Sequence, residues 1–359
     1  MAELGRGLVS RVVSPDSLTD NELAAWRRAR EAHPALGSPF FSASFTRAVA
    51  RVRHDVRVCV IGSEGKPVAF LPLQFGSGAR RLLGAAEPVG GEMSDYFGLI
   101  APPGFKIEAR TLLSMAKLSA IDFRNLPEEE LSFGLDGEQP ERGHRIEIGA
   151  DVGEYWERLR QENESFAREL ERRERRIVEA LGPLDFTFNV ADPERELDRL
   201  VAMKRAQYRE TGVPDALAEP WQRHLLRLLA ASADADCAGS LATLNAGGHW
   251  VASHFGLRSG TTLHYWFPVF NPALAKFGPG HLLLKHVIDG CAAAGIRTID
   301  RGSGEQSHKS AYVTVPRLYY RGCWHDGSTR AVMYRGLQSL AWRWQKHRRA
   351  AGAAGNREP

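Results

Sequence analysis

The sequence has few cysteines and no long apolar run, and both absences narrow the class of protein. It holds four cysteines in 359 residues, and none of them stands in a CxxC motif or a short Cys/His spacing. We therefore expect neither a disulfide framework nor a metal site, and the scattered thiols favour a reducing, cytoplasmic compartment. No apolar run approaches the ~20 residues that cross a bilayer, and the first residues lack the apolar centre of a signal peptide.

Positive charge is also scarce outside the C-terminal end. The formal net charge is +4, but residues 335–359 hold six Lys and Arg residues and one Glu, which leaves −1 for the rest of the chain. A general nucleic-acid binder carries its positive charge on the folded surface, so this class is not favoured. Hydrophobic residues at 43% and charged residues at 25% are typical of soluble globular proteins, and the length favours two domains.

Periodicity in the first half predicts a hairpin followed by helices and single strands. Residues 56–61 and 67–75 are rich in apolar residues and flank a Ser-Glu-Gly-Lys turn, which is the pattern of a β-hairpin. Helices are expected over 20–31, 42–52 and 107–118, and further strands over 81–85, 96–100, 120–123, 131–135 and 145–148.

The second half repeats this order around a three-stranded meander. Its strands are expected over 239–244, 250–257 and 261–267. The remaining elements are helices over 153–181, 192–210, 221–231 and 278–294, strands over 185–190, 298–300 and 318–324, and a C-terminal helix. We therefore predict an α+β protein of two similar domains, 1–150 and 151–359, each a mixed, mostly antiparallel sheet flanked by helices.

The segment 265–284 joins the last meander strand to a helix through the tripeptide Gly-Pro-Gly. Proline fits the first helical turn, where its missing N–H costs nothing, and glycine lets a ligand approach the backbone. Free N–H groups at the helix start, from Gly280 to Leu283, would then face an anion. An ordinary loop with a proline-started helix is the alternative. The residues predicted to bind an anionic donor are Lys276, Gly278, Gly280, His281 and Leu282.

A series of short motifs runs through the chain in a fixed order: VAFLPL at 68–73, SDY at 94–96, GGHWVA at 247–252, FNP at 270–272, FGPGHLL at 277–283 and the segment 300–309. Together with the order of meander, glycine loop, helix and strand, the series resembles the acyl-CoA-binding core of the GNAT N-acyltransferase superfamily. It is most similar to the CelD-like branch, associated with cellulose biosynthesis, and more distantly to FemAB-type aminoacyl-tRNA-dependent transferases. One departure is that the common GNAT loop is Q/R-x-x-G-x-G/A, whereas Ala275 stands three residues before Gly278.

The resemblance implies how an acyl group would reach an amine. Backbone N–H groups at the splayed end of the strand 261–267, near 266–269, would stabilise the carbonyl oxygen. Asp300 or Glu305 would deprotonate the amine, and Lys309 would orient or neutralise the donor carbonyl. A turn cap at Asp300 and a solvated Lys309 are the alternatives.

The acceptor is expected between the two domains, because domain junctions are favoured ligand sites. His254 and His264 lie on adjacent predicted strands, where they would either serve as a base near neutral pH or be core residues. The residues predicted to contact the acceptor are His254, Tyr265, Trp266, Asp95 and Tyr96.

The sequence thus predicts an N-acyltransferase that moves an acyl group from acyl-CoA, as a co-substrate, to a small-molecule or peptide amine. One alternative is an aminoacyl-tRNA donor, which would need a basic surface beside the loop. Another is a non-catalytic accessory protein of polysaccharide or envelope assembly. The long helix 154–181 has a local basic cluster, but its seven arginines and eight glutamates are also the pattern of a solvated face. The cluster consists of Arg172, Arg173, Arg175 and Arg176.

Overall fold

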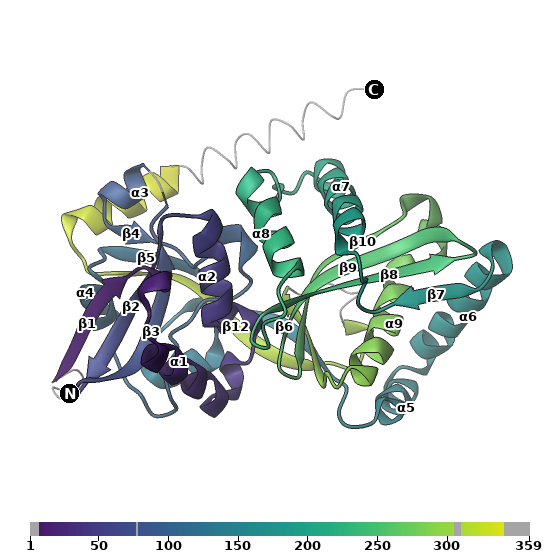
Figure 1. The fold of residues 1–359 in the computed structure, drawn as a ribbon, viewed down its shortest axis with the longest axis horizontal. Coiled ribbons are helices and arrows are strands. Elements are labelled where there is room, and N and C mark those ends of the chain that lie inside the picture. The colour runs from purple at the N-terminus through teal and green to yellow at the C-terminus, as the bar shows by residue number, and fades with distance from the viewer. Residues whose placement is uncertain (1–6, 77, 305–309, 341–359) are drawn as a thin grey trace.

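Two sheets and the helices packed on them make up the described chain (Figure 1). The structure, a computed structural model, describes residues 7–76, 78–304 and 310–340. One sheet has three strands in the order β1-β2-β3, and the other has nine in the order β4-β5-β12-β6-β11-β10-β9-β8-β7. The predicted α+β class is confirmed. Within the described ranges, no helix is both long and apolar enough to span a bilayer.

The first half begins with helices that pack on the small sheet. α1 (Asp20–Ala32) starts at a capping box, in which the Thr19 hydroxyl accepts from the Glu22 N–H and the Glu22 carboxylate accepts from the Thr19 N–H. The predicted hairpin is present as β2 and β3. The other elements of this half are β1 (Leu8–Val13), α2 (Ala43–Val52), β2 (Val56–Ser63), β3 (Lys66–Gln74), α3 (Ala79–Leu82), β4 (Ala85–Ala86), α4 (Ala109–Ala116), β5 (Ala120–Pro127) and β6 (Glu138–Glu147).

The second half contains the predicted meander, but its first helix is divided in two. The break lies at Asn163, whose side chain accepts from the Phe166 N–H and so begins a new helix. The elements are α5 (Val152–Glu162), α6 (Glu164–Leu181), β7 (Leu184–Thr187), α7 (Pro193–Thr211), α8 (Pro220–Ala230), β8 (Ala238–Ala246), β9 (His249–Ser259), β10 (Thr262–Phe270), α9 (Pro279–Ala293), β11 (Thr298–Ser303) and β12 (Val315–His325).

The large sheet joins the two halves of the chain. β12, near the end of the sequence, lies between β5 and β6 of the first half. On its other edge β6 pairs with β11 of the second half. The halves therefore share the hydrogen bonds of one sheet. The division into domains 1–150 and 151–359 falls just after β6, and it stays a prediction.

Three short strands predicted in the first half are wrong. Residues 81–85 lie largely in and after the helical turn α3, and residues 131–135 overlap a 3-10 helix, Glu128–Phe133. Residues 96–100 form a loop that meets β3 at one bridge, Ile100 to Phe70. The loop is apolar because it is buried beside the sheets, and a buried loop has the same composition as a short strand.

The parallel pair β10 and β11 separates two different environments. Alternate residues of a strand point to opposite faces of the sheet. Leu263 and Ile299 belong to an apolar core shared with α5, α6 and α9. Their neighbours His264 and Asp300 point to the other face, where the Phe40 ring of the first half packs against His264 with 4.8 Å between ring centroids. This second face holds most of the candidate site.

Candidate functional site

Helix α9 begins at the predicted Gly-Pro-Gly turn. Gly278 has a φ of 65°, a left-handed conformation that favours glycine. Its carbonyl accepts from the N–H groups of His281 and Leu282, at 3.0 and 3.3 Å. These two amides are therefore used inside the turn, and the expectation that they are free is wrong. A Cβ added at Gly280 would meet nothing within 4 Å, so the open part of the helix start lies there.

Cationic side chains gather at this helix start. Arg173 of α6 lies so close to Gly278 that a Cβ there would overlap its guanidinium. Arg176 and Lys276 each lie over the Phe277 ring. The distances from their charged ends to the ring centroid are 5.8 and 5.0 Å. A helix N-terminus already favours an anion, and these charges strengthen that preference. The arrangement suits a phosphate-bearing ligand.

Aromatic rings hold the first turn of α9 in place. The Tyr312 hydroxyl donates to the His281 carbonyl at 3.0 Å, and Phe166 packs edge-on against the His281 ring at 5.2 Å. Arg301 of β11 lies over the Tyr312 ring at 5.4 Å. His281 is thus at the predicted position, but the contacts that the structure shows for it are mainly packing contacts.

The strands β10 and β11 form a fork. Their parallel ladder ends where His264 lies opposite Asp300. The ladder between β9 and β10 is also interrupted between His264 and Phe267. Such an irregularity bends the strand and turns its backbone groups away from the regular ladder. The predicted contacts Tyr265 and Trp266 lie at this bend, beyond the last residue paired with β11.

His264 lies between two carboxylates, one from each half of the chain. Its Nε2 atom is 2.5 Å from a carboxylate oxygen of Asp95, and its Nδ1 atom is 3.8 Å from a carboxylate oxygen of Asp300. The His264 side chain is fully buried, whereas 34% of the Asp95 side chain is exposed. Asp95 is therefore the more exposed of the two carboxylates, and His264 lies between it and Asp300.

Two tyrosines fix the position of Asp300. The Tyr96 hydroxyl donates to the Asp300 carboxylate at 2.6 Å, and the Tyr319 hydroxyl donates to the Tyr96 oxygen at 2.9 Å. Burial, together with the charge of Asp300, raises the pKa of Tyr96, so this hydroxyl keeps its proton and remains a donor. Tyr96, predicted to contact the acceptor, is fully enclosed and positions a carboxylate instead.

His254 is not placed to contact an acceptor. Its side chain is buried and stacks on Tyr265 with 4.0 Å between ring centroids. Its Nε2 atom accepts from the Trp266 N–H at 3.2 Å, so that amide is not available to an oxyanion. Burial lowers the pKa of His254 to about 3, and the ring stays neutral at physiological pH. Of the two histidines on adjacent strands, His264 is the one suited to proton transfer.

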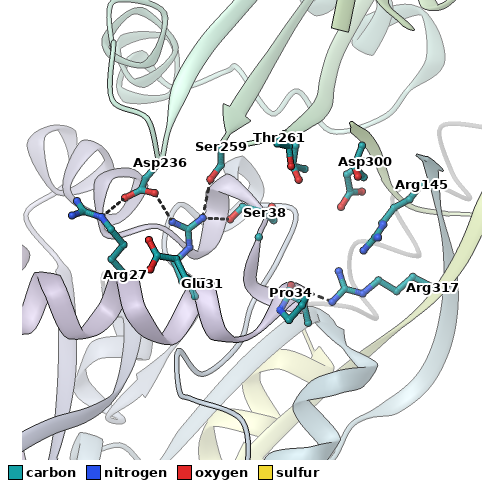
Figure 2. Close-up of a pocket in the computed structure, with 16 residues that line it drawn as sticks. Arg27, Glu31, Pro34, Ser38, Arg145, Asp236, Ser259, Thr261, Asp300 and Arg317 are labelled. Atoms are coloured by element: carbon teal, nitrogen blue, oxygen red, sulfur yellow. Dashed lines mark hydrogen bonds and ion pairs between the residues drawn. The ribbon is translucent and has the colours of Figure 1, made fainter. Parts of the chain in front are cut away.

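A row of charged side chains crosses the sheet on the same face as His264. Arg145 of β6 lies directly opposite Asp300 of β11, and Val315 of β12 lies opposite Arg145 on the other side. Arg317 is two residues beyond Val315 and therefore shares its face. Figure 2 shows Asp300, Arg145 and Arg317 on one side of an open space, pointing into it.

This open space is a cavity of about 520 Å³ between the two halves of the chain. Another part of its lining is built around Arg30 of α1, which donates to the Ser259 hydroxyl at 2.9 Å and forms an ion pair with Asp236 at 3.2 Å. Its volume falls within the usual range of small-molecule sites. The cavity lies where the acceptor is expected, at the junction of the halves.

Two predicted catalytic residues, Glu305 and Lys309, lie outside the described residues, so their roles stay predictions. Asp300, the third, is at the fork. Among the residues that the structure describes, no group of three or more His, Cys, Asp and Glu side chains is arranged to hold a metal ion.

Sequence reasoning missed Arg145 and Arg317, which are 172 positions apart and meet because β12 returns to pair with β6. No local signal marks them. The importance of His264 could have been seen from its alternation with Leu263, which faces the apolar core. Asp95 was predicted to contact the acceptor, but its contact with His264 could not have been seen in the sequence.

The family comparison agrees with this geometry. Residues 164–310 match the family model described as an acetyltransferase (GNAT) domain. The match spans the meander, the start of α9 and the fork. No curated protein is significantly similar to the chain in sequence.

Solved structures resemble the chain over most of its length. The C-terminal domain (DUF2156) of an Agrobacterium fabrum protein named as a lysylphosphatidylglycerol synthetase has a TM-score of 0.51 at 12% identity, covering 89% of this chain and 97% of that chain. FemX has a TM-score of 0.52 at 10% identity, with 85% and 97% covered. L-PGS from Bacillus licheniformis has a TM-score of 0.51 at 14% identity, with 89% and 95% covered. At such identities the likeness concerns the fold alone.

Proposed function

We propose that the protein is an N-acyltransferase that moves an acyl group from acyl-CoA to an amine. One observation carries this proposal: the fork between β10 and β11 lies between a cationic helix start and a histidine held by two carboxylates. The motifs of the meander and the loop favour the CelD-like branch of the GNAT superfamily.

The donor would bind at the start of α9. Its diphosphate fits the open position at Gly280, with Arg173, Arg176 and Lys276 close to the same turn. The thioester would enter the fork, where backbone N–H groups of β10 beyond its ladder with β11 stabilise the oxyanion. Because Trp266 already donates to His254 and Pro268 has no N–H, Tyr265 is the remaining candidate donor at the bend.

Asp95 and His264 would remove the proton from the amine. The amine nitrogen attacks the thioester carbonyl carbon, its proton passes to the exposed oxygen of Asp95, and the C–S bond then breaks with its electron pair on sulfur. His264, at 2.5 Å from Asp95, stabilises the carboxylate before the transfer and shares the proton after it. Asp300 lies on the other side of the imidazole ring, 3.8 Å from its Nδ1 atom.

A second candidate donor is an aminoacyl-tRNA. The observation that favours it is the position of Arg173 beside Gly278, because the basic cluster of α6 then continues directly from the helix start. A tRNA would bind with a steep dependence on salt concentration. The chemistry at the fork would be the same, with an ester oxygen as the leaving atom in place of sulfur.

The test is thermal stabilisation of the protein by CoA, acetyl-CoA and deacylated tRNA, each measured separately. A ligand that binds only the folded protein raises its melting temperature. We expect a rise with both CoA compounds. A rise with tRNA alone would identify an aminoacyl-tRNA, and not acyl-CoA, as the donor. No rise with any of the three would favour the non-catalytic accessory role.

The variant Gly280→Asp links this binding to the helix start. A carboxylate in the first turn of a helix stabilises the fold through the helix dipole, but it repels a phosphate. We expect the variant to melt no lower than the parent protein and to lose the shift with acetyl-CoA. The matched control is Gly336→Asp, a helical position with equally open surroundings far from the fork in sequence. An undiminished shift in Gly280→Asp would rule out this donor site.

A further inference from the structure

Most residues that line the cavity between the two halves are polar or charged. Apart from Pro34, Ala35 and two glycines, its lining consists of charged residues, serines and threonines. Such a surface does not suit an acyl chain, which needs apolar walls. It suits a small ligand with several polar or charged groups.

Arg145 and Arg317 each keep part of the guanidinium available. Arg145 uses Nε and Nη2 to bind Glu147, and Arg317 uses the same two atoms to bind Glu129. For each arginine, the Nη1 atom has no hydrogen-bond partner among the described residues. The two guanidinium groups lie on one face of adjacent strands, and each carries a positive charge that opposes the other. An anion between them would relieve this repulsion and accept from both.

Asp300 adds the opposite charge beside this pair. It lies directly across from Arg145 on the neighbouring strand, where Cβ atoms are about 4.5–5.5 Å apart. One of its carboxylate oxygens accepts from Tyr96 and from the Gly302 N–H, and the second has no partner among the described residues. A cation bound there would lie next to His264.

A buried hydroxyl also lacks a partner at this cavity. The Ser38 side chain lines the cavity and is only 5% exposed, and no hydrogen bond to its hydroxyl exists in the described part of the chain. A buried polar group without a partner costs free energy, so it indicates a position where a ligand or a water molecule completes the contact. Ser38 lies on the wall opposite Asp300 (Figure 2).

We propose that this cavity binds the acceptor, and that the acceptor is a small amino-acid-like molecule that carries both an amine and an anionic group. The inference rests on the proposed function, in which an amine attacks at the fork. The anionic group accepts from Arg145 and Arg317, and the amine contacts Asp300, next to the His264–Asp95 pair that takes its proton. The spacing of Asp300 and Arg145 on neighbouring strands fits an amine and a carboxylate or phosphate separated by a few bonds.

Calorimetric titration without any donor tests this proposal. The probes are alanine and phosphoethanolamine, which carry both groups, and ethylamine and acetate, which carry one each. We expect the two-group probes to bind about tenfold or more tightly than either one-group probe. Tighter binding of alanine identifies a carboxylate acceptor, and tighter binding of phosphoethanolamine identifies a phosphate one. Equal affinities across the four probes would overturn the proposal.

Two variants locate the binding. Arg145→Gln removes one cationic partner, and we expect the better two-group probe to bind about tenfold or more weakly. Thr262→Phe fills part of the cavity without touching the arginines and should have the same effect, which keeps the test valid if Arg145→Gln folds poorly. The matched control is Arg321→Gln, an exposed arginine on β12 outside the cavity lining. Unchanged affinity in both Arg145→Gln and Thr262→Phe would exclude this cavity.

The failure of this inference is distinguishable from the failure of the proposed function. If acetyl-CoA stabilises the protein but no two-group probe binds, the acceptor assignment is wrong and the acyltransferase proposal stands. If a two-group probe binds in the cavity but neither CoA compound nor tRNA stabilises the protein, the transferase proposal is wrong and the binding site stands.

Discussion

The two faces of the β10–β11 pair are formed by alternate residues of the same two short strands, and they serve different purposes. On one face, Leu263 and Ile299 join an apolar core with α9. On the other, His264 contacts Asp95 of the first half, and Asp300 lies opposite Arg145 of β6. A strand alternates its side chains with a period of two, so two adjacent residues can supply stability and chemistry separately. A substitution on one face should therefore affect the other face little.

The faces also differ in where their partners come from. The start of α9 and the basic residues of α6 lie within the second half of the chain. The polar face needs Asp95 and Tyr96 from the first half and Arg317 from the returning strand β12. In the proposed function, donor binding is therefore a local property of the second half. Acceptor binding and proton transfer would depend on the assembly of both halves.

The largest effect is expected from Asp95→Asn on the polar face. The change keeps the shape of the side chain and removes the base, so kcat should fall about 10²–10⁴-fold. The melting temperature and the stabilisation by acetyl-CoA should change little, because both depend on the other face. Asp16→Asn, at an exposed ion pair with Arg47, is the control and should keep full activity. A normal kcat in Asp95→Asn would remove the assigned role.

The next largest effect is expected on the free energy of unfolding, when two neighbouring residues on opposite faces of β10 are each replaced by alanine. Leu263→Ala leaves a cavity in the apolar core, and the free energy of unfolding should fall by about 2–5 kcal/mol. Thr262→Ala, one residue earlier and facing the polar cavity, should change it by less than about 1 kcal/mol. Urea denaturation of both variants measures the difference. Similar losses in the two variants would show that the faces are not independent.

The sequence predicted the elements of the second half well because their signals are local. Glycine turns delimit the meander strands, and the Gly-Pro-Gly turn marks the start of α9. The errors in the first half have a physical reason. Segments such as 96–100 are apolar because tertiary packing buries them, and no local pattern separates this from pairing in a sheet.

Only part of the candidate site was predicted, because the sequence carries local signals and not the tertiary packing that brings the residues together. Motifs indicated Asp95 and Asp300 separately; Asp95 lies at a bend in a loop and Asp300 lies within β11. Their meeting through His264 depends on how the halves pack. The position of Arg317 depends on β12 crossing into the first half, a pairing between residues far apart in the sequence. Single-sequence patterns do not encode such register.

The smallest effect concerns the pH dependence of stability that comes from the half-buried ammonium group of Lys204. Lys204 of α7 donates to the Pro268 carbonyl of β10 at 3.3 Å and to Gln207 at 3.1 Å, and no described carboxylate is within ion-pair distance. Burial lowers the pKa of Lys204 to about 8, whereas an unfolded lysine has a value near 10.5. Between these values the unfolded state binds more protons, so this residue makes stability rise as the pH increases from 8 to 10.5.

Lys204→Met should remove that contribution to the pH dependence. The free energy of unfolding, measured in urea at a series of pH values, should rise less steeply between pH 8 and 10.5 in the variant than in the parent protein. The control Lys66→Met, at the exposed turn between β2 and β3, should keep the parent slope. If Lys204→Met also keeps it, the ammonium is solvated in the folded state. The buried charges on the polar face would then all have an oppositely charged partner, which would sharpen the contrast with the apolar face.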